Sequence, residues 1–319
     1  MTTDGGIPGY RVLRALGRGQ TSLVSLAVDE RGQKVALKIP HPETLKDSKA
    51  AERFGNEVRL SLRLRHPRVV EGLAGTAFGA GAFLAMQYFP EGTLTRWMEI
   101  ARLTPEEAYS VGADIAEALA YLHAQDMIHQ DVKAQNVYLK DGRAALGDFG
   151  SAYFASQGGK PAGSPFYMAP EIYLGETSSP ASDVYSLGVL LYEMLGGRRP
   201  HVAATYDALM AAHLNAYPAP LASLAPNLPA GVTRVVERAL AKRASDRPDA
   251  QTIHDMLVRA QGKLTLSDAV AAPPPAAAVP PAKAVGRHGA TPAPAKPEPQ
   301  PPAPEPRGFS FNPFKKRKG

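Results

Sequence analysis

The chain has 319 residues, of which 36 are Lys or Arg and 30 are Asp or Glu, with 30 Pro, 29 Gly and no Cys. This length suits one large or two ordinary domains, and 44% hydrophobic with 21% charged residues is typical of a globular protein. The lack of cysteine excludes disulfide scaffolds, Cys-ligated zinc, iron–sulfur clusters and thiol catalysis. Because we find neither a long apolar run nor a signal-peptide pattern, we expect a cytoplasmic protein without a transmembrane segment.

Most of the positive charge lies near the C-terminus. From Thr265 to Gly319 the sequence has 14 Pro, 8 basic and 3 acidic residues, so this segment carries +5 of the net charge of +6. The rest of the chain is almost neutral, and its charge gives no reason to propose binding to nucleic acid. The stretch 271–307 consists mostly of Ala and Pro, which bury too little apolar surface to offset the entropy of ordering. We therefore predict a disordered linker over 263–308 and a separate terminal element over 309–319.

Strand-like patterns come first in the chain. After a Gly-rich turn, apolar residues alternate with small ones from Val24 to Val28. Asp29 to Gly32 has the composition of a turn, so Gln33 to Ile39 is predicted to be the next strand of an antiparallel hairpin. Ala50 to Leu64 has helical spacing, and Phe83 to Tyr88 is typical of another strand.

Helical spacing dominates after residue 90. Thr104 and Glu107 match a capping box, with Pro105 at the first helical position. Apolar residues then keep helical spacing at Val111, Ile115, Leu119 and Leu122. Because strands come first and helices later, the pattern predicts an α+β protein with a sheet-rich N-terminal lobe and a helical C-terminal lobe.

A Gly-rich loop is the first candidate for chemistry. Gly17, Gly19 and Ser22 lie between two predicted strands, whereas a helix follows the loop in a dinucleotide fingerprint. Small residues let backbone N–H groups approach phosphate oxygens, although an ordinary hairpin turn has the same composition.

The second candidate is a lysine within an apolar strand. The strand period places Ala36 and Lys38 on one face. Such a lysine either binds an anionic ligand or extends its stem from the core to solvent. Glu57, on the next predicted helix, is the candidate partner that would favour the first interpretation.

The decisive cluster follows the first long helix. Residues 128–136 read IHQDVKAQN, with Asp-Phe-Gly at 148–150 and Ala-Pro-Glu at 169–171. In this order and spacing, the chain resembles the eukaryotic-type (Hanks-type) protein kinases, in particular the Ser/Thr kinases that bacteria encode. Further matches in family order are LRHP at 64–67, GSPFYM at 163–168, DVYSLG at 183–188 and DRP at 246–248.

The resemblance extends from about Tyr10 to Gln261. It implies a bilobal protein-kinase-like fold, with a kinase domain over 10–262 that follows a short N-terminal extension over 1–9. The antiparallel N-lobe would span about 10–90 and the helical C-lobe about 91–262.

The resemblance also implies an activity, which is the transfer of a phosphoryl group from ATP to Ser or Thr hydroxyls of protein substrates. Lys38 is then expected to bind the α- and β-phosphates and to be held by Glu57. Asp131 would accept or orient the proton of the substrate hydroxyl. Lys133 would offset the charge that develops on the transferred group.

The implied nucleotide site includes a divalent cation. Asn136 and Asp148 would supply oxygen ligands to Mg²⁺, with Mn²⁺ as an alternative ion. The other positions implied to contact the nucleotide are Leu16, Gly17, Gly19, Ser22, Val24, Ala36, Met86, Gln87, Phe89 and Tyr138.

Other matches are expected to be structural. Glu171 and Arg247 correspond to a buried ion pair of the helical lobe, and Asp183 to a residue that braces the catalytic loop. His129 is expected to pack and to form hydrogen bonds, not to act as a base.

The sequence departs from the family pattern at three positions. Ser22 replaces the third glycine of the loop, and Ser164 replaces a threonine but keeps a hydroxyl able to contact Asp131 and Lys133. Gln130 replaces the arginine that helps many kinases to bind a phosphate on the activation loop. The loop over 151–168 also contains no threonine. We therefore expect activity that does not depend on phosphorylation of this loop.

Two alternatives to a protein kinase stay open. A pseudokinase would keep the fold as a binding scaffold, but Lys38, Asp131 and Asp148 are all present. A small-molecule phosphotransferase would not be expected to have Lys133 or the Ala-Pro-Glu segment.

The C-terminal element Phe309–Lys318 has three phenylalanines beside four consecutive cations. This pattern predicts docking to a partner protein or to an anionic membrane surface, where each basic residue contributes roughly 1 kcal/mol. The alternative is a solvated terminus without a partner.

Overall fold

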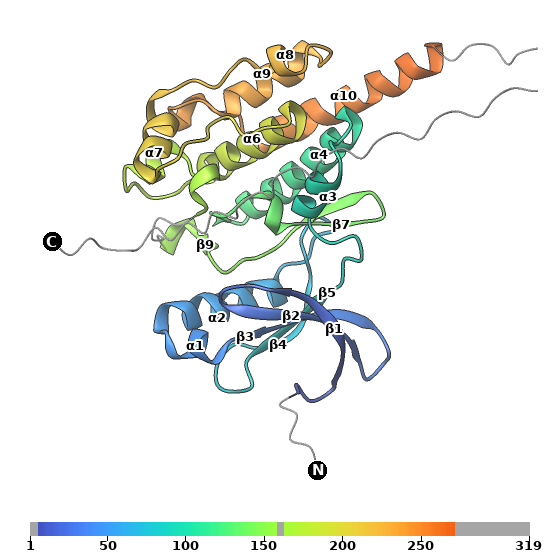
Figure 1. The fold of residues 1–319 in the computed structure, drawn as a ribbon, viewed down its shortest axis with the longest axis vertical. Helices are drawn as coiled ribbons and strands as arrows, with labels where there is room; N and C mark the ends of the chain where they lie inside the picture. Colours follow the sequence, from blue (N-terminus) through green and yellow to red (C-terminus); the bar gives the residue numbers. More distant parts are fainter. Residues whose placement is uncertain (1–5, 158–162, 272–319) are drawn as a thin grey trace, which may run out of the picture. The chain divides into compact units, whose positions relative to one another are not determined.

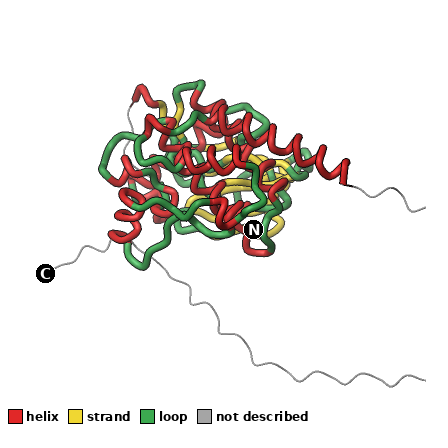
Figure 2. Tube along the Cα trace, turned by 90° about the horizontal axis from the view of Figure 1, so that it is seen from above, coloured by secondary structure: helices red, strands yellow, loops and turns green. Residues whose placement is uncertain are grey.

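The structure is a computed structural model that describes residues 6–157 and 163–271. The predicted linker from 272 onward and the element Phe309–Lys318 lie outside these residues. The described chain forms a sheet-rich N-terminal lobe, blue in Figure 1, and a helical C-terminal lobe, green to orange. Strands and helices overlap in the view from above (Figure 2), as expected when one lobe lies over the other. The predicted α+β, bilobal fold is confirmed.

The N-terminal lobe is a five-stranded antiparallel sheet of order β1-β2-β3-β5-β4. Its elements are β1 (Tyr10–Arg18), β2 (Ser22–Asp29), β3 (Lys34–Pro40), α1 (Pro42–Lys46), α2 (Ser48–Arg63), β4 (Gly72–Thr76) and β5 (Phe83–Gln87). The strands and the long helix predicted in this lobe are therefore present, with ends shifted by one or two residues.

Helix α2 packs closely against β4 and β5. Its apolar side chains Phe54 and Val58, four residues apart, are buried at 5% and 2% exposure. Glycine in β4 permits the close approach, because a Cβ at Gly72 would lie 2.7 Å from the carbonyl carbon of Ser61. This packing fixes the face of α2 that carries Glu57.

The C-terminal lobe is built on α4 (Pro105–His123) and α6 (Pro180–Gly196), which pack against each other. The predicted capping box begins α4: Glu107 N–H donates to Thr104 Oγ1 at 3.2 Å, and Thr104 N–H donates to the Glu107 carboxylate at 2.8 Å. The remaining α-helices are α3 (Leu94–Ile100), α5 (Pro170–Tyr173), α7 (Tyr206–Asn215), α8 (Leu221–Leu224), α9 (Ala230–Ala239) and α10 (Ala250–Ala271).

Short strands and single-turn helices connect α4 to α6 and precede α10. They are β6 (Met127–Ile128), η1 (Ala134–Asn136), β7 (Val137–Lys140), β8 (Arg143–Leu146), β9 (Tyr153–Phe154), η2 (Ala155–Gln157), η3 (Pro165–Tyr167) and η4 (Ala244–Asp246). β6 pairs with β9, and β7 with β8. In Figure 1, β7 and β9 lie between the helices of the C-terminal lobe and the sheet of the N-terminal lobe. The motif-bearing segments are therefore at the junction of the lobes.

Helix α10 extends to Ala271, beyond residue 262 where the predicted domain ends. The residues from Met1 to Ser267 form one compact unit. Among the described residues, no helix is both long enough and apolar enough to cross a membrane.

Candidate active site

A tight hairpin places the two predicted metal-binding positions beside each other. Asn136 precedes β7 and Asp148 closely follows β8, and Gly147 N–H donates to the Asn136 carbonyl at 2.9 Å. The turn residues Asp141 and Gly142 have φ values of 53° and 70°, the conformation that Asp-Gly adopts in two-residue hairpin loops. Local turn chemistry therefore brings the two metal-ligand candidates together.

Lys38 of β3 and Glu57 of α2 form an ion pair. The ammonium nitrogen lies 2.6 and 2.7 Å from the two carboxylate oxygens, and the side chains are only 14% and 6% exposed. Burial by itself lowers the pKa of Lys38, but Glu57 and Asp148 outweigh it and raise the pKa above the usual value. Burial raises the pKa of Glu57, although Lys38 acts in the opposite direction. Because both short contacts match an ammonium donating to a carboxylate, we take the pair to be ionised.

Asp148 is held close to this ion pair. Lys38 lowers the pKa of Asp148 below its usual value, against the effect of burial. Its backbone is in the left-handed region, with φ 65°, which is uncommon for a residue other than glycine. Asn56 of α2 tethers the following segment, because its side-chain amide donates to the carbonyls of Phe149 at 3.3 Å and Ala152 at 2.7 Å. The site thus keeps an ionised carboxylate in a constrained conformation.

Three side chains converge on the carboxylate of Asp131. Lys133 Nζ and Asn136 Nδ2 donate to Oδ2 at 2.6 and 3.1 Å, and Ser164 Oγ donates to Oδ1 at 2.9 Å. Lys133 Nζ also donates to Ser164 Oγ at 2.8 Å, as expected for the hydroxyl at that position. A carboxylate has about four lone-pair positions, so about one is left for a further donor.

Asp183 of α6 holds the catalytic loop, which is the segment 128–136 that carries Asp131. The Asp183 carboxylate accepts hydrogen bonds from the backbone N–H groups of His129 and Gln130, both at 2.8 Å. His129 Nε2 lies 3.1 Å from the Gly147 carbonyl, and its ring meets Phe149 edge-on at 5.2 Å between centroids. Both residues therefore have the structural contacts expected of them.

The side chain of Gln130 joins the loop to another segment. Its amide Nε2 donates to Ser178 Oγ at 2.9 Å, and Tyr153 OH donates to the Ser178 carbonyl at 2.9 Å. The φ of Gln130 is 67°, so the catalytic loop is also constrained at this position. Neutral hydrogen bonds thus link β9, the catalytic loop and the segment before α6.

The candidate adenine positions gather in one apolar cluster. Val24, Ala36, Met86, Phe89 and Tyr138 all belong to it, although Val24 and Tyr138 are only partly buried. At the edge of this cluster one backbone donor already has a hydrogen-bond partner, because the N–H of Gln87 donates to the Glu71 carbonyl at 2.9 Å. Among the described residues, the N–H of Phe89 has no backbone partner.

The Gly-rich loop connects β1 to β2, and β2 carries Val24 of the same apolar cluster. Gly17 pairs with Val24 across β1 and β2, and Leu16 is 37% exposed. The N–H of Gly19 donates to the Ser22 carbonyl at 2.9 Å, which closes the loop, and Ser22 is buried. The predicted nucleotide positions thus come from β1 to β3 with the Gly-rich loop, from β5 and the residues after it, and from β7.

The donor set suits a magnesium nucleotide. Asp148 offers an ionised carboxylate and Asn136 an amide oxygen, and Mg²⁺ usually takes one or two such ligands together with substrate phosphates. No group of three or more His, Cys, Asp or Glu side chains able to hold a metal occurs within 6–157 and 163–262.

Sequence reasoning missed three side chains that hold the site in place. One is Asn56, and the others, His41 and Thr44, contact the Gly-rich loop. Thr44 Oγ1 donates to the Thr21 carbonyl at 2.7 Å, and His41 Nε2 lies 3.0 Å from the Gly19 carbonyl. The sequence signals these three residues only through their proximity to Lys38 and Glu57. The residues that they contact lie more than 20 positions away along the chain, so no local pattern indicates the contacts.

Comparison with known proteins agrees with this geometry. Residues 10–257 match the family described as "Protein kinase domain". The chain is 34% identical over 272 residues to "Serine/threonine-protein kinase pkn2" of Myxococcus xanthus, covering 80% of this chain and 33% of that protein. It is 33% identical over 266 residues to "Serine/threonine-protein kinase PkaA" of Streptomyces coelicolor, covering 76% and 48%. It is also 33% identical over 251 residues to "Serine/threonine-protein kinase PknA" of Mycobacterium tuberculosis, covering 75% and 58%.

The chain spans about a third to three fifths of the length of these curated relatives. The family match over 10–257 includes every motif that forms the site. With the match over 10–257 and the geometry around Lys38, Asp131 and Asp148, the chain belongs to the protein kinase family.

Proposed function

We propose that this chain is a protein-serine/threonine kinase that transfers the γ-phosphoryl group of ATP, with Mg²⁺, to hydroxyl groups of protein substrates. The observation that carries the proposal is the presence of two constellations of polar side chains that lie close together, since the charges of both Lys38 and Lys133 act on Asp148. One is the Lys38–Glu57 ion pair beside Asp148, and the other is Asp131 with Lys133 and Asn136. The family uses ATP and Mg²⁺, and both constellations suit such a substrate.

The first constellation would bind the nucleotide. Lys38, fixed by two contacts to Glu57, presents a localised positive charge for the α- and β-phosphates. Asp148 and Asn136 would bind the ion that neutralises the phosphates when the nucleotide is bound. The apolar cluster around Ala36 and Met86 would take the adenine ring.

The second constellation would prepare the acceptor. The remaining lone-pair position of Asp131 would accept a hydrogen bond from the substrate hydroxyl and orient its oxygen toward the γ-phosphate. Lys133 already contacts both Asp131 and Ser164, so its charge lies next to the reacting group. Ser164 holds the carboxylate from the other side.

The test is incubation of the purified full chain with ATP, Mg²⁺ and a generic Ser/Thr substrate, followed by mass-spectrometric mapping of the phosphorylated residues. The proposal requires phosphoserine or phosphothreonine on the substrate and its loss in Asp131→Asn. Nucleotide binding without phosphoryl transfer under varied metal conditions would instead identify a pseudokinase. Phosphorylation of small molecules but not of proteins would identify a small-molecule phosphotransferase.

We further propose that activity does not require phosphorylation of the activation loop. Gln130 stands where an arginine would pair with a phosphate, and its amide donates to Ser178 instead. Two other cations could take the place of that arginine, and one of them, Arg143, donates to Asp114 at 2.7 Å. The other candidate, Lys160, lies outside the described residues. The enzyme should keep its activity after phosphatase treatment and in Ser151→Ala and Ser156→Ala variants. A large fall in these samples would show that another cation binds a loop phosphate.

We propose a docking role for the element Phe309–Lys318, which lies outside the described residues. The support is compositional, since three aromatic side chains adjoin four cations after a Pro-rich spacer. A chain that ends after Ala271 should keep its melting temperature and its activity on a generic peptide. It should lose association with a partner protein or with anionic vesicles, and unchanged association would support the solvated terminus. Cytoplasmic location stays a prediction from the sequence.

A further inference from the structure

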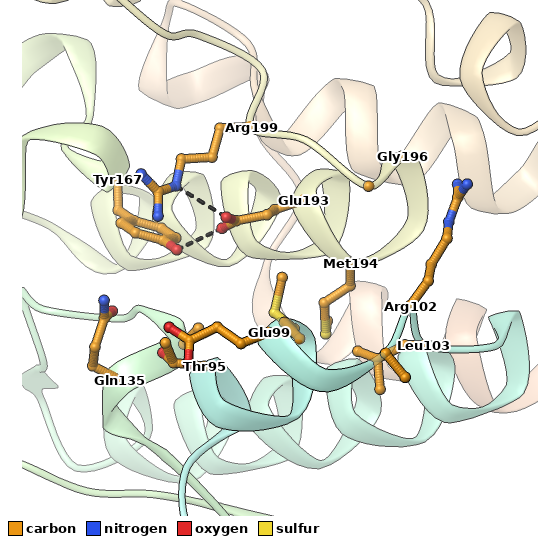
Figure 3. Close-up of a pocket in the computed structure, with 14 residues that line it drawn as sticks. Thr95, Glu99, Arg102, Leu103, Gln135, Tyr167, Glu193, Met194, Gly196 and Arg199 are labelled. Carbon is orange, nitrogen blue, oxygen red and sulfur yellow. Dashed lines mark hydrogen bonds and ion pairs between the residues drawn. The ribbon is translucent and has the colours of Figure 1, made fainter. Parts of the chain in front are cut away.

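Most tyrosine hydroxyls in the described part of the chain have a hydrogen-bond partner. Figure 3 shows one of them, where Tyr167 OH donates to the Glu193 carboxylate at 2.5 Å beside a pocket between α3 and α6. Tyr138 of β7 differs, because its hydroxyl makes no hydrogen bond to any described residue. Its oxygen is also accessible, whereas that of Tyr109 is buried without a partner among the described residues. The hydroxyl of Tyr138 can therefore bond to a ligand.

The Tyr138 ring lies near Phe89 and near the residue before Asp148. Its centre is 5.8 Å from that of the Phe89 ring. A Cβ at Gly147 would lie 3.1 Å from Tyr138 Cε2 and 2.9 Å from Val70 Cγ2. Gly147 does not have a positive φ, so its backbone does not require glycine. The absence of a side chain at 147 instead leaves the space that the Tyr138 ring and Val70 fill.

Charged groups of the candidate site act on this hydroxyl. Burial raises the pKa of Tyr138 to about 12, Lys38 acts to lower it, and Asp148 and Glu57 add to the rise. At neutral pH the phenol is therefore protonated and can donate a hydrogen bond. Because interactions between charges weaken with distance, these effects agree with a hydroxyl that lies close to Lys38 and Asp148. A ligand atom that pairs with this hydroxyl would thus be an acceptor on that side of the site.

A purine nucleotide has an acceptor that suits this place. The backbone of 87–89 is expected to contact the base edge that carries N1 and N6, and the Phe89 N–H has no backbone partner among the described residues. Lys38 is expected to bind the phosphates, which are joined to the base through N9 and the ribose. With these two ends fixed, the base would turn its N7 toward Lys38 and Asp148. N7 of adenine is a hydrogen-bond acceptor.

We propose that the hydroxyl of Tyr138 donates a hydrogen bond to N7 of the bound purine, which makes Tyr138 a specificity-determining residue for the nucleotide. An aliphatic side chain at this position would give the base an apolar contact only. A pyrimidine nucleotide would leave the hydroxyl without this partner. The role of Tyr138 rests on the proposed kinase function and deepens it, because it names the atom by which the site selects a purine.

The test measures the dissociation constants of ATP and of 7-deaza-ATP, in which a C–H group replaces N7. Each nucleotide displaces a ribose-labelled fluorescent ATP from the full chain in the presence of Mg²⁺. The original chain should bind ATP about two- to tenfold more tightly than 7-deaza-ATP, the effect of one neutral hydrogen bond. Tyr138→Phe should weaken ATP binding by a similar factor and leave 7-deaza-ATP nearly unchanged. The ratio of the two constants should then be near one.

Tyr217→Phe provides the matched control. It removes the same hydroxyl from a side chain that is 81% exposed in the C-terminal lobe, so the ratio should stay at its original value. Tyr138→Leu removes the ring together with the hydroxyl. This variant should bind both nucleotides more weakly than Tyr138→Phe does, again with a ratio near one.

Equal affinities of the original chain for ATP and 7-deaza-ATP would overturn this inference and leave the proposed function intact. A preference for ATP that persists in Tyr138→Phe would also overturn it, and weaker ATP binding in that variant would then point to a phosphate oxygen as the acceptor. The titration does not depend on phosphoryl transfer. If transfer fails while the ratio behaves as expected, the role of Tyr138 is supported and the kinase activity is refuted. The absence of nucleotide binding would refute both proposals.

Discussion

At the scale of single residues, Asp131 illustrates how the site is prepared for its substrate. Lys133, Asn136 and Ser164 hold the carboxylate through hydrogen bonds of 2.6–3.1 Å. These contacts fix its orientation before the substrate arrives, so little reorganisation is needed when the hydroxyl binds. Lys38 and Asp148 have a different role in the proposed reaction, because they would bind the nucleotide and its metal ion and not the substrate hydroxyl.

Asp131→Asn should lower kcat by about 100-fold or more, because the amide cannot accept a proton as the carboxylate does. The dissociation constant for ATP should stay nearly unchanged. Lys38→Met and Asp148→Ala should instead weaken nucleotide binding itself. Steady-state kinetics together with a direct titration of a fluorescent nucleotide would separate the two effects. A large loss of ATP affinity in Asp131→Asn would contradict the assigned division of roles.

At the scale of elements, the Gly-rich loop is held by the segment that follows β3. Thr44 Oγ1 and the His41 backbone N–H both donate to the Thr21 carbonyl, at 2.7 and 2.9 Å. A carbonyl oxygen only accepts, so His41 Nε2 donates to Gly19 over its 3.0 Å contact. These bonds limit the movement of the loop that would cover the phosphates.

Thr44→Val should raise the KM for ATP by about two- to tenfold, the effect of one lost neutral hydrogen bond. His41→Phe should act in the same direction, and kcat should change less. Thr44→Ser and His41→Gln keep a donor near the same place and should restore most of the affinity. The measurement is the ATP dependence of the initial rate, and equal KM values for Val and Ser at position 44 would refute the role of this bond.

A second element-scale feature is a buried pair of histidines between α6 and α7. His213 Nδ1 lies 2.8 Å from Tyr185 OH, and the rings of His201 and His213 are 4.9 Å apart. Their Nε2 atoms are buried without a hydrogen-bond partner among the described residues. Burial, with the charge of Lys242 nearby, lowers the pKa of His201 to about 4. Burial, with His201 and Lys242, lowers the pKa of His213 to about 3.

Stability should therefore fall in acid. In the unfolded chain a histidine titrates near pH 6.5, so below that pH the unfolded state binds protons that the folded state does not. The stabilisation is complete above about pH 6.5 and is lost progressively as the pH falls toward the folded values. The melting temperature at pH 7.5 and at pH 5 should differ less in His213→Asn than in the original chain. His254→Asn, at a partly exposed position, is the control, and an unchanged difference in His213→Asn would exclude this origin.

At the scale of the whole molecule, one ion pair joins distant parts of the C-terminal lobe. Arg247 donates to both carboxylate oxygens of Glu171 at 2.7 Å, and the Arg247 side chain is fully buried. Burial acts to raise the pKa of Glu171, but Arg247 outweighs it and the pKa is lowered. The pair connects the segment after the activation loop to the residues just before α10.

Arg247→Ala should destabilise the fold by about 3–5 kcal/mol, because it leaves a buried carboxylate without its partner. Arg65→Ala is the matched control: its 3.1 Å pair with Glu71 is exposed, so the loss should be about 1 kcal/mol or less. Urea unfolding of both variants measures the difference. Similar losses for the two arginines would show that the buried pair is no more important than an exposed one.

Much of the fold and of the site could be predicted from the sequence because the signals were local. The capping box at Thr104, the apolar face of α4 and the strand that carries Lys38 each depend on residues a few positions apart. The order of the motifs indicated the family, and the Lys38–Glu57 pair was expected. Helix α10 continues to Ala271, within the range 263–308 for which the sequence predicts a linker.

The sequence by itself therefore determined the element types, the family and the chemical identities of the residues in the cleft, since these depend on local periodicity and motif spacing. Only the tertiary structure decided which distant side chains meet. Asn56 reaches Ala152 and Gln130 reaches Ser178, while the hydroxyl oxygen of Thr95 is buried without a hydrogen-bond partner among the described residues. These contacts depend on how whole elements pack, and packing brings together residues whose separation along the chain carries no periodic signal.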